Sequence, residues 1–222
     1  GLPAIRIRPP AVQATVLFNP QTSFEWYLQA LIQPAVLHLL TACVVVMAMG
    51  RELQGKSLAA WKRETGGGLA ALLGKLTPYL AALTFWGAVW LIWLCGVRGW
   101  TMNGSLLLTL FAQSLLFAGT AAISLLLVIG VRKASFAFSA SALYAGSALA
   151  YSGGTLPLDS GSGFARNWSA VLPFTHYLRL QMDQFLGAPL SVALPQLGVL
   201  SLYLLVPLAL VLLPVSYTHL RA

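Results

Sequence analysis

The fold is decided by a charged stretch, RELQGKSLAAWKRETGGGLAALLGK (residues 51–75), which separates two long uncharged segments. Residues 26–50 before it and residues 76–97 after it carry no formal charge. Each segment exceeds the roughly 20 apolar residues that a helix needs to cross a membrane. The charged side chains of residues 51–75 are Arg51, Lys56, Lys62, Arg63 and Lys75, with Glu52 and Glu64. Because Lys and Arg accumulate on the cytoplasmic side of membranes, we expect this charged loop (residues 51–75) to be cytoplasmic.

The composition of the whole chain indicates an all-α integral membrane protein. Charged residues make up 8% of the 222 positions and hydrophobic residues 58%, whereas a soluble domain has about 25% charged residues. The net charge of +8 comes from basic residues at the ends of apolar segments, which suit anionic lipid headgroups. We therefore predict lipid contact and no nucleic-acid partner. Cys43 and Cys95 fall inside apolar segments, so neither a disulfide nor a metal site is predicted.

The uncharged segments predict five transmembrane helices. They cover about residues 28–50, 76–97, 106–131, 135–152 and 195–213, within a transmembrane domain of residues 28–214. The fourth is rich in Ala, Ser and Gly, which allow close helix packing. Placing residues 51–75 and 132–133 in the cytoplasm puts seven Lys and Arg there. Residues 1–27 are therefore expected on the outer side of a bacterial inner membrane. An odd number of spans then implies a fragment that lacks an earlier span.

Three further regions are expected to lie outside the membrane core. Residues 1–27 contain short alternating and β-branched runs, which are typical of the last strands of an extracytoplasmic α/β domain. Residues 167–186 mix apolar residues with Arg179 and Asp183 and predict a short outer helix, interfacial or re-entrant. Residues 215–222 resemble translated adapter sequence, and we assign them no function.

The charged loop has two possible structures. A helix from Arg51 to Glu64 would place Leu53, Ser57, Ala60 and Trp61 on one side and most basic residues on the other. That pattern is typical of a helix lying in the membrane interface. The alternative is an irregular loop that only fixes the topology. The pair Gly74-Lys75 does not complete a P-loop, because Leu69 and Leu76 stand where Gly and Ser or Thr are required.

Other candidate sites lie in the spans and in the outer connection. His38, inside the first span, could relay protons or be a neutral histidine bonded to a neighbouring helix. Trp86, Trp90 and Trp93 share one helical face and could line a substrate path or contact lipid. His176 and Asp183, with Ser162 nearby, are ingredients of a hydrolase, but no Gly-x-Ser-x-Gly elbow is present.

The order of several short motifs resembles the membrane permeases of type-2 ABC exporters, especially the bacterial multidrug branch. The motifs are Phe18-Asn19-Pro20, Pro34, Arg51-Glu52-x-x-Gly55, Gly74-Lys75-x-x-Pro78-Tyr79, Ser152-Gly153-Gly154 with Pro157, and Leu172-Pro173. The resemblance covers nearly the whole chain. Leu53-Gln54 and Lys56-Ser57 stand where family members commonly have a second Arg-Glu pair and a Thr after the Gly.

The resemblance implies a permease without an ATPase site of its own. It implies an interfacial coupling helix in the charged loop, with ATPase-contacting residues Arg51, Glu52, Gly55, Lys56, Trp61 and Arg63. It also implies an ABC ATP-binding subunit that holds ATP and Mg²⁺, and a second permease subunit, identical or different. The cargo would be hydrophobic or amphipathic. Two other functions stay open: an enzyme using His176 and Asp183 on a lipid-linked substrate, and an anchor subunit that does not transport.

Overall fold

The computed structural model describes residues 23–54, 57–66, 68–131, 133–155 and 161–212. Every regular element within these residues is a helix. The helices are α1 (Phe24–Glu52), α2 (Leu58–Glu64), α3 (Gly68–Gly96), α4 (Leu106–Val131), α5 (Ala134–Tyr151), α6 (Gly163–Val171), α7 (Pro173–Leu186) and α8 (Leu190–Leu212). The strands predicted before residue 19 and the tail at 215–222 lie outside the described residues.

Four of these helices are long and apolar enough to cross a membrane: α1, α3, α4 and α8. They correspond to four of the five predicted spans, although α1, α3 and α8 each begin four to eight residues earlier than predicted. The fifth predicted span is the 18-residue helix α5. Its many Ala and Ser side chains make it less apolar than the other four, so its crossing of the membrane stays a prediction.

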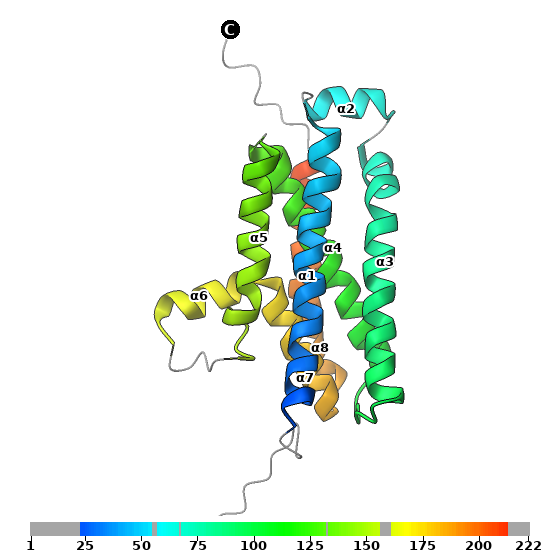
Figure 1. The fold of residues 1–222 in the computed structure, drawn as a ribbon, viewed down its shortest axis with the longest axis vertical. Helices are drawn as coiled ribbons and strands as arrows, with labels where there is room; N and C mark the ends of the chain where they lie inside the picture. The colour runs from blue at the N-terminus through cyan, green and yellow to red at the C-terminus, as the bar shows by residue number, and fades with distance from the viewer. Residues whose placement is uncertain (1–22, 55–56, 67, 132, 156–160, 213–222) are drawn as a thin grey trace, which may run out of the picture.

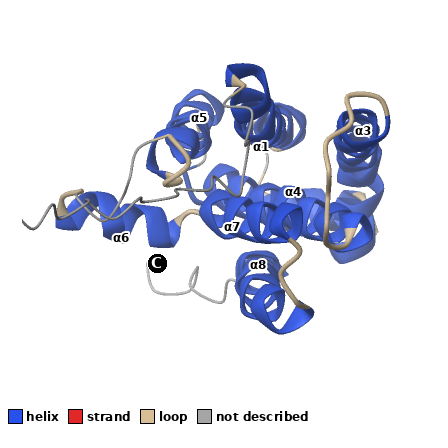
Figure 2. Ribbon diagram, turned by 90° about the horizontal axis from the view of Figure 1, so that it is seen from below, coloured by secondary structure: helices blue, strands red, loops and turns tan. Residues whose placement is uncertain are grey.

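Helix α4 lies at the centre of the bundle. It contacts α1, α3, α5, α7 and α8, and Figure 2 shows it surrounded by these helices. The neighbouring helices can approach α4 closely because many of its buried side chains are small, or short and polar. The buried set includes Ala112, Gln113, Gly119, Thr120, Ala121, Ala122 and Ser124.

The outer connection forms two helices instead of the single one predicted over residues 167–186. The break falls at Leu172-Pro173, where Leu172 has extended backbone angles (φ −94°, ψ 122°). Proline disfavours helical geometry in the residue before it, and it fits the first turn of the next helix. Helix α6 projects sideways from the bundle (Figure 1). Helix α7 ends at Leu186 and is followed by Gly187, whose left-handed backbone (φ 83°) is common just after a helix.

The charged loop also differs from the prediction of one helix over residues 51–64. Helix α1 continues through Arg51 to Glu52, and a turn follows it. A separate helix, α2, then lies across the end of α1 (Figure 1). Ser57 caps α2, because its hydroxyl accepts a hydrogen bond from the Ala60 N–H at 3.1 Å. The charged loop therefore contains the end of α1 and a separate helix α2, with a turn at Leu53-Gln54 after α1.

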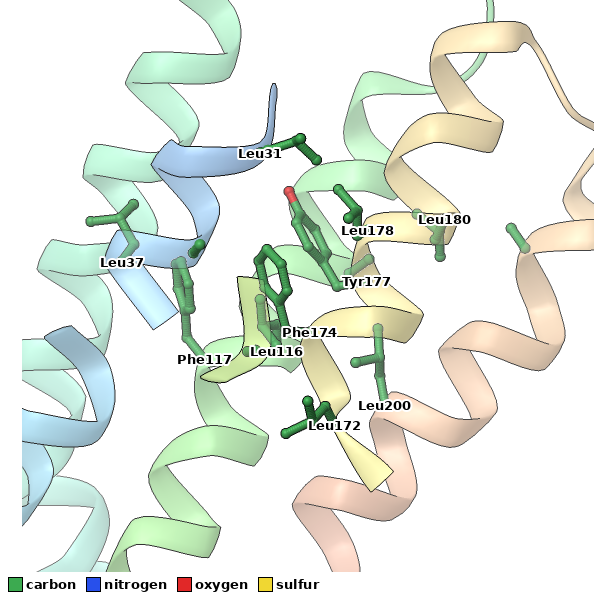
Figure 3. Packing of buried hydrophobic residues seen from close by; sticks show 14 residues of the cluster. Leu31, Leu37, Leu116, Phe117, Leu172, Phe174, Tyr177, Leu178, Leu180 and Leu200 are labelled. Carbon is green, nitrogen blue, oxygen red and sulfur yellow. The ribbon is translucent and has the colours of Figure 1, made fainter. Parts of the chain in front are cut away.

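The main core joins α7 to the spans. Phe174 and Tyr177 of α7 are fully buried and lie beside Phe117 of α4 and leucines of α1 and α8 (Figure 3). Helix α7 is thus packed into the bundle although it is too short to cross a membrane at about 1.5 Å per residue. Burial of these aromatic side chains fixes the outer connection against α4.

A substitution at Gly119 can test how closely α4 and α8 approach each other. A Cβ atom at Gly119 would lie 3.2 Å from the Cβ of Tyr203, so a branched side chain would push the two helices apart. We expect Gly119→Ile to destabilise the bundle by about 1–3 kcal/mol, measured by reversible unfolding in mixed micelles. Gly130→Ile is the matched control on the same helix, because nothing lies within 4 Å of that position. Equal stability of the two variants would contradict the packing.

Candidate functional site

Trp61 anchors α2 in the end of the bundle. Its side chain is only 3% exposed. Trp61 belongs to a buried cluster that also contains residues of five other helices: Val45, Val46 and Met49 of α1; Leu72 and Leu76 of α3; Ala121, Leu125 and Val128 of α4; Ala137 of α5; and Val211 of α8. The predicted apolar side of the loop helix therefore exists at Trp61, and it faces the protein core.

Two polar contacts hold the same end of the bundle. Lys62 Nζ donates to the carbonyl of Val211 at 3.3 Å, which lies in the last turn of α8. Lys75 Nζ of α3 pairs with Glu52 Oε1 of α1 at 2.6 Å. Both partners of the second pair are more than a third exposed, so this ion pair contributes little stability. Its effect is to fix where α1 ends relative to α3.

The residues predicted to contact an ATPase fall into three groups. Trp61 points into the core, and Glu52 is half-buried in its pair with Lys75. Arg51 and Arg63 are exposed, which leaves them available to a partner. Gly55 and Lys56 lie outside the described residues. Sequence reasoning missed the contact between Lys62 and Val211. The available signal was the position of Lys62, which directly follows Trp61 on a short helix.

His38 lies fully buried in the middle of α1. Its Nδ1 is 2.8 Å from the hydroxyl oxygen of Thr120, and that oxygen is 2.7 Å from the carbonyl of Leu116. A carbonyl only accepts hydrogen bonds, so the single hydroxyl hydrogen points to Leu116. Both contacts are then hydrogen bonds only if Nδ1 carries the imidazole hydrogen. In neutral His38, Nε2 therefore carries a lone pair and no hydrogen.

The surroundings of His38 are polar but uncharged. Its ring stacks on Phe174 at 5.7 Å and is tilted against Tyr144 at 6.3 Å between centroids. His38 Nε2 and the buried hydroxyls of Ser124, Ser141 and Tyr144 have no hydrogen-bond partner among the described residues. This geometry fits the alternative of a histidine bonded to a neighbouring helix. The proton relay stays a prediction.

The three tryptophans of α3 do not share one environment. Trp86 is 58% exposed, whereas Trp90 and Trp93 lie 5.1 Å apart and pack against a buried cluster with Leu91 and Leu94. Sequence reasoning missed Gln113 of α4, whose buried amide faces α3 and has no partner among the described residues. A substrate path along the tryptophans stays a prediction.

His176 is held by structural contacts. Its Nδ1 lies 2.9 Å from Gln196 Oε1 and its Nε2 lies 3.1 Å from the carbonyl of Ala170. Partial burial raises the pKa of the Asp183 carboxyl, and Arg179 opposes that shift. Ser162 caps α6 by accepting from the Ala165 N–H, so it serves the helix end. The described residues contain no group of three or more His, Cys, Asp or Glu that could hold a metal ion.

The burial of Trp61 leads to a direct test. We expect Trp61→Ala to destabilise the protein by about 3–5 kcal/mol, because it removes a large side chain that is almost fully buried. Trp86→Ala is the matched control, since that indole is mostly exposed. Unfolding of both variants in the same micelles measures the difference. A Trp61→Ala variant as stable as the control would show that α2 is not anchored by this residue.

The proton position on His38 is also measurable. The chain has three histidines, so ¹⁵N-histidine spectra of the protein in lipid bilayers are simple to assign with His38→Gln. We expect the His38 signals of a neutral ring protonated at Nδ1, and Thr120→Val should remove this preference because its methyl group cannot accept the hydrogen bond. A ring protonated at Nε2 in the wild type would contradict the assignment.

A family comparison agrees with this architecture. Residues 3–213 match the family described as ABC-2 family transporter protein. No curated protein and no solved structure matches the chain. Four helices in the described part of the chain are long and apolar enough to cross a membrane, which agrees with a multi-pass membrane protein. With a match over nearly its full length, the chain belongs to the ABC-2 transporter family.

Proposed function

We propose that the chain is the permease subunit of an ATP-driven exporter, powered by a separate ATP-binding subunit that docks on the charged loop. The observation that carries this proposal is the placement of α2. Its Trp61 is buried in a cluster that includes residues of five other helices, while Arg63 on α2 and Arg51 at the end of α1 are exposed. A partner that binds the exposed side would act on the core through the buried side. ATP and Mg²⁺ would be bound by that partner.

The proposed topology follows from the charge distribution. The charged loop and residues 132–133 face the cytoplasm of a bacterial cell, and the start of α1 faces outward. Helix α5 then acts as the fifth span, since it returns the chain across the membrane beside α1 and α4, which it contacts. The rest of the lipid-exposed surface comes from α3 and α8, in whose spans only 17% of residues are buried within the bundle.

The cargo is proposed to be hydrophobic or amphipathic. The polar groups in the middle of the bundle, around His38 and Thr120, are neutral hydroxyls and an imidazole. Such groups can hydrogen-bond an uncharged molecule, but they offer no counter-charge to an ion. The resemblance to the multidrug branch supports the same cargo, and it supports pairing with a second permease subunit.

Two other functions make different predictions. An enzyme acting on a lipid-linked substrate would need His176 free to transfer protons, yet both ring nitrogens already have partners in α6 and α8. An anchor subunit would bind the ATPase without moving cargo. Transport by the reconstituted complex separates the anchor from the permease.

The pair of Glu52 and Lys75 tests the docking surface. We expect Glu52→Lys to lower cargo-stimulated ATP hydrolysis by the assembled complex, because like charges would separate the ends of α1 and α3. The double variant with Lys75→Glu restores the pair with its charges exchanged, and it should recover the stimulation. Arg51→Glu should reduce co-purification of the ATP-binding subunit with the permease. Unchanged coupling and co-purification in all three would remove the charged loop from the mechanism.

A further inference from the structure

Helix α8 is attached to the charged loop at one end. The carbonyl of Val211 lies in its last turn, where helix carbonyls lack N–H partners. Lys62 supplies a donor there at 3.3 Å, and a cation also suits the negative end of the helix dipole. The side chain of Val211 belongs to the cluster around Trp61. A Cβ atom on Gly68 would lie 3.6 Å from both Leu212 and Lys62, so little space separates α2, α3 and α8.

The same helix is attached to the outer connection farther along. The hydroxyl of Tyr203 donates to the carbonyl of Ala170 in α6 at 3.2 Å. Gln196 contacts His176 of α7 at 2.9 Å. His176 also bonds Ala170, so α6, α7 and α8 meet at one set of polar contacts. Helices α6 and α7 lie away from α2 along the long axis of the bundle (Figure 1).

Between Gln196, which contacts α7, and Val211, which contacts α2, helix α8 packs closely on the central helix α4. Tyr203 lies against Gly119 of α4, with only 3.2 Å left for a Cβ atom. Pro207 lacks the N–H that would bond the carbonyl of Tyr203, but it is buried and the helix continues through it to Leu212. A displacement of the loop end of α8 is therefore confined by α4 and passes along the helix axis.

We propose that α8 mechanically links the charged loop to α6 and α7, and that Lys62 is the positioning residue that fastens this link. The proposal rests on the proposed function, because the displacement that the link would transmit comes from an ATP-binding subunit at α2. It identifies α6 and α7 as the elements whose position responds to that subunit. The link itself is present in the chain alone and can be measured without a partner.

Hydrogen exchange of the isolated membrane protein in nanodiscs tests the link. We expect Lys62→Met to make the amides of residues 163–186 exchange several-fold faster, although they lie far from the substitution. Lys62→Arg should keep the wild-type rates, because a guanidinium can still donate to the Val211 carbonyl. Lys133→Met is the charge-matched control, an exposed basic residue before α5. Faster exchange confined to α2 and the first turns of α3 would overturn the link.

The assembled complex gives the second measurement. Spin labels at Asn167 of α6 and Ile92 of α3, both exposed, report the distance between these helices with and without ATP. We expect ATP to change the distance in the wild type and in Lys62→Arg, and to leave it unchanged in Lys62→Met while the ATP-binding subunit still co-purifies. A Lys62→Met complex with the wild-type change would overturn the role of Lys62. If no ATP-binding subunit bound the wild type, the proposed function would fail, and the exchange experiment would still decide the link.

Discussion

The structure depends on how closely five helices can approach α4. Inside a bilayer the hydrophobic effect does not drive helices together, so packing contacts and hydrogen bonds must do so. The alanines, Gly119 and short hydroxyl side chains of α4 allow its neighbours to come near, and Tyr203 of α8 fills the space left at Gly119. The core aromatic side chains of α7 then pack where α4 meets α1 and α8.

The charged loop combines two roles because its helix has two different sides. On the inner side, Trp61 and Lys62 contact the bundle and the end of α8. On the outer side, Arg63 is exposed. Trp61 is buried in a cluster that includes residues of five other helices, whereas a helix that only rested on anionic lipid would turn its apolar side to the lipid. This burial is the argument for the proposed coupling role of α2.

The middle of the bundle has a different chemistry from its ends. His38 is bonded to Thr120, and Tyr144 lies nearby with its hydroxyl unpaired among the described residues. Uncharged polar groups can be buried at moderate cost when they bond one another, whereas isolated charges are far more costly to bury. The cations and carboxylates of the described spans accordingly lie near the helix ends, and the core keeps only neutral hydrogen-bonding groups.

The sequence by itself determined the membrane class, four of the spans and the position of the charged loop, because apolar length and Lys/Arg placement are properties of consecutive residues. It failed where the outcome depended on distant contacts. The loop contains the end of α1 and a separate helix α2, whose Trp61 is buried in a cluster with residues of other helices, and no local periodicity encodes that burial. Likewise, the sequence singled out His38, but only the tertiary structure could supply Thr120, which lies 82 positions away and reaches it because α1 and α4 pack side by side.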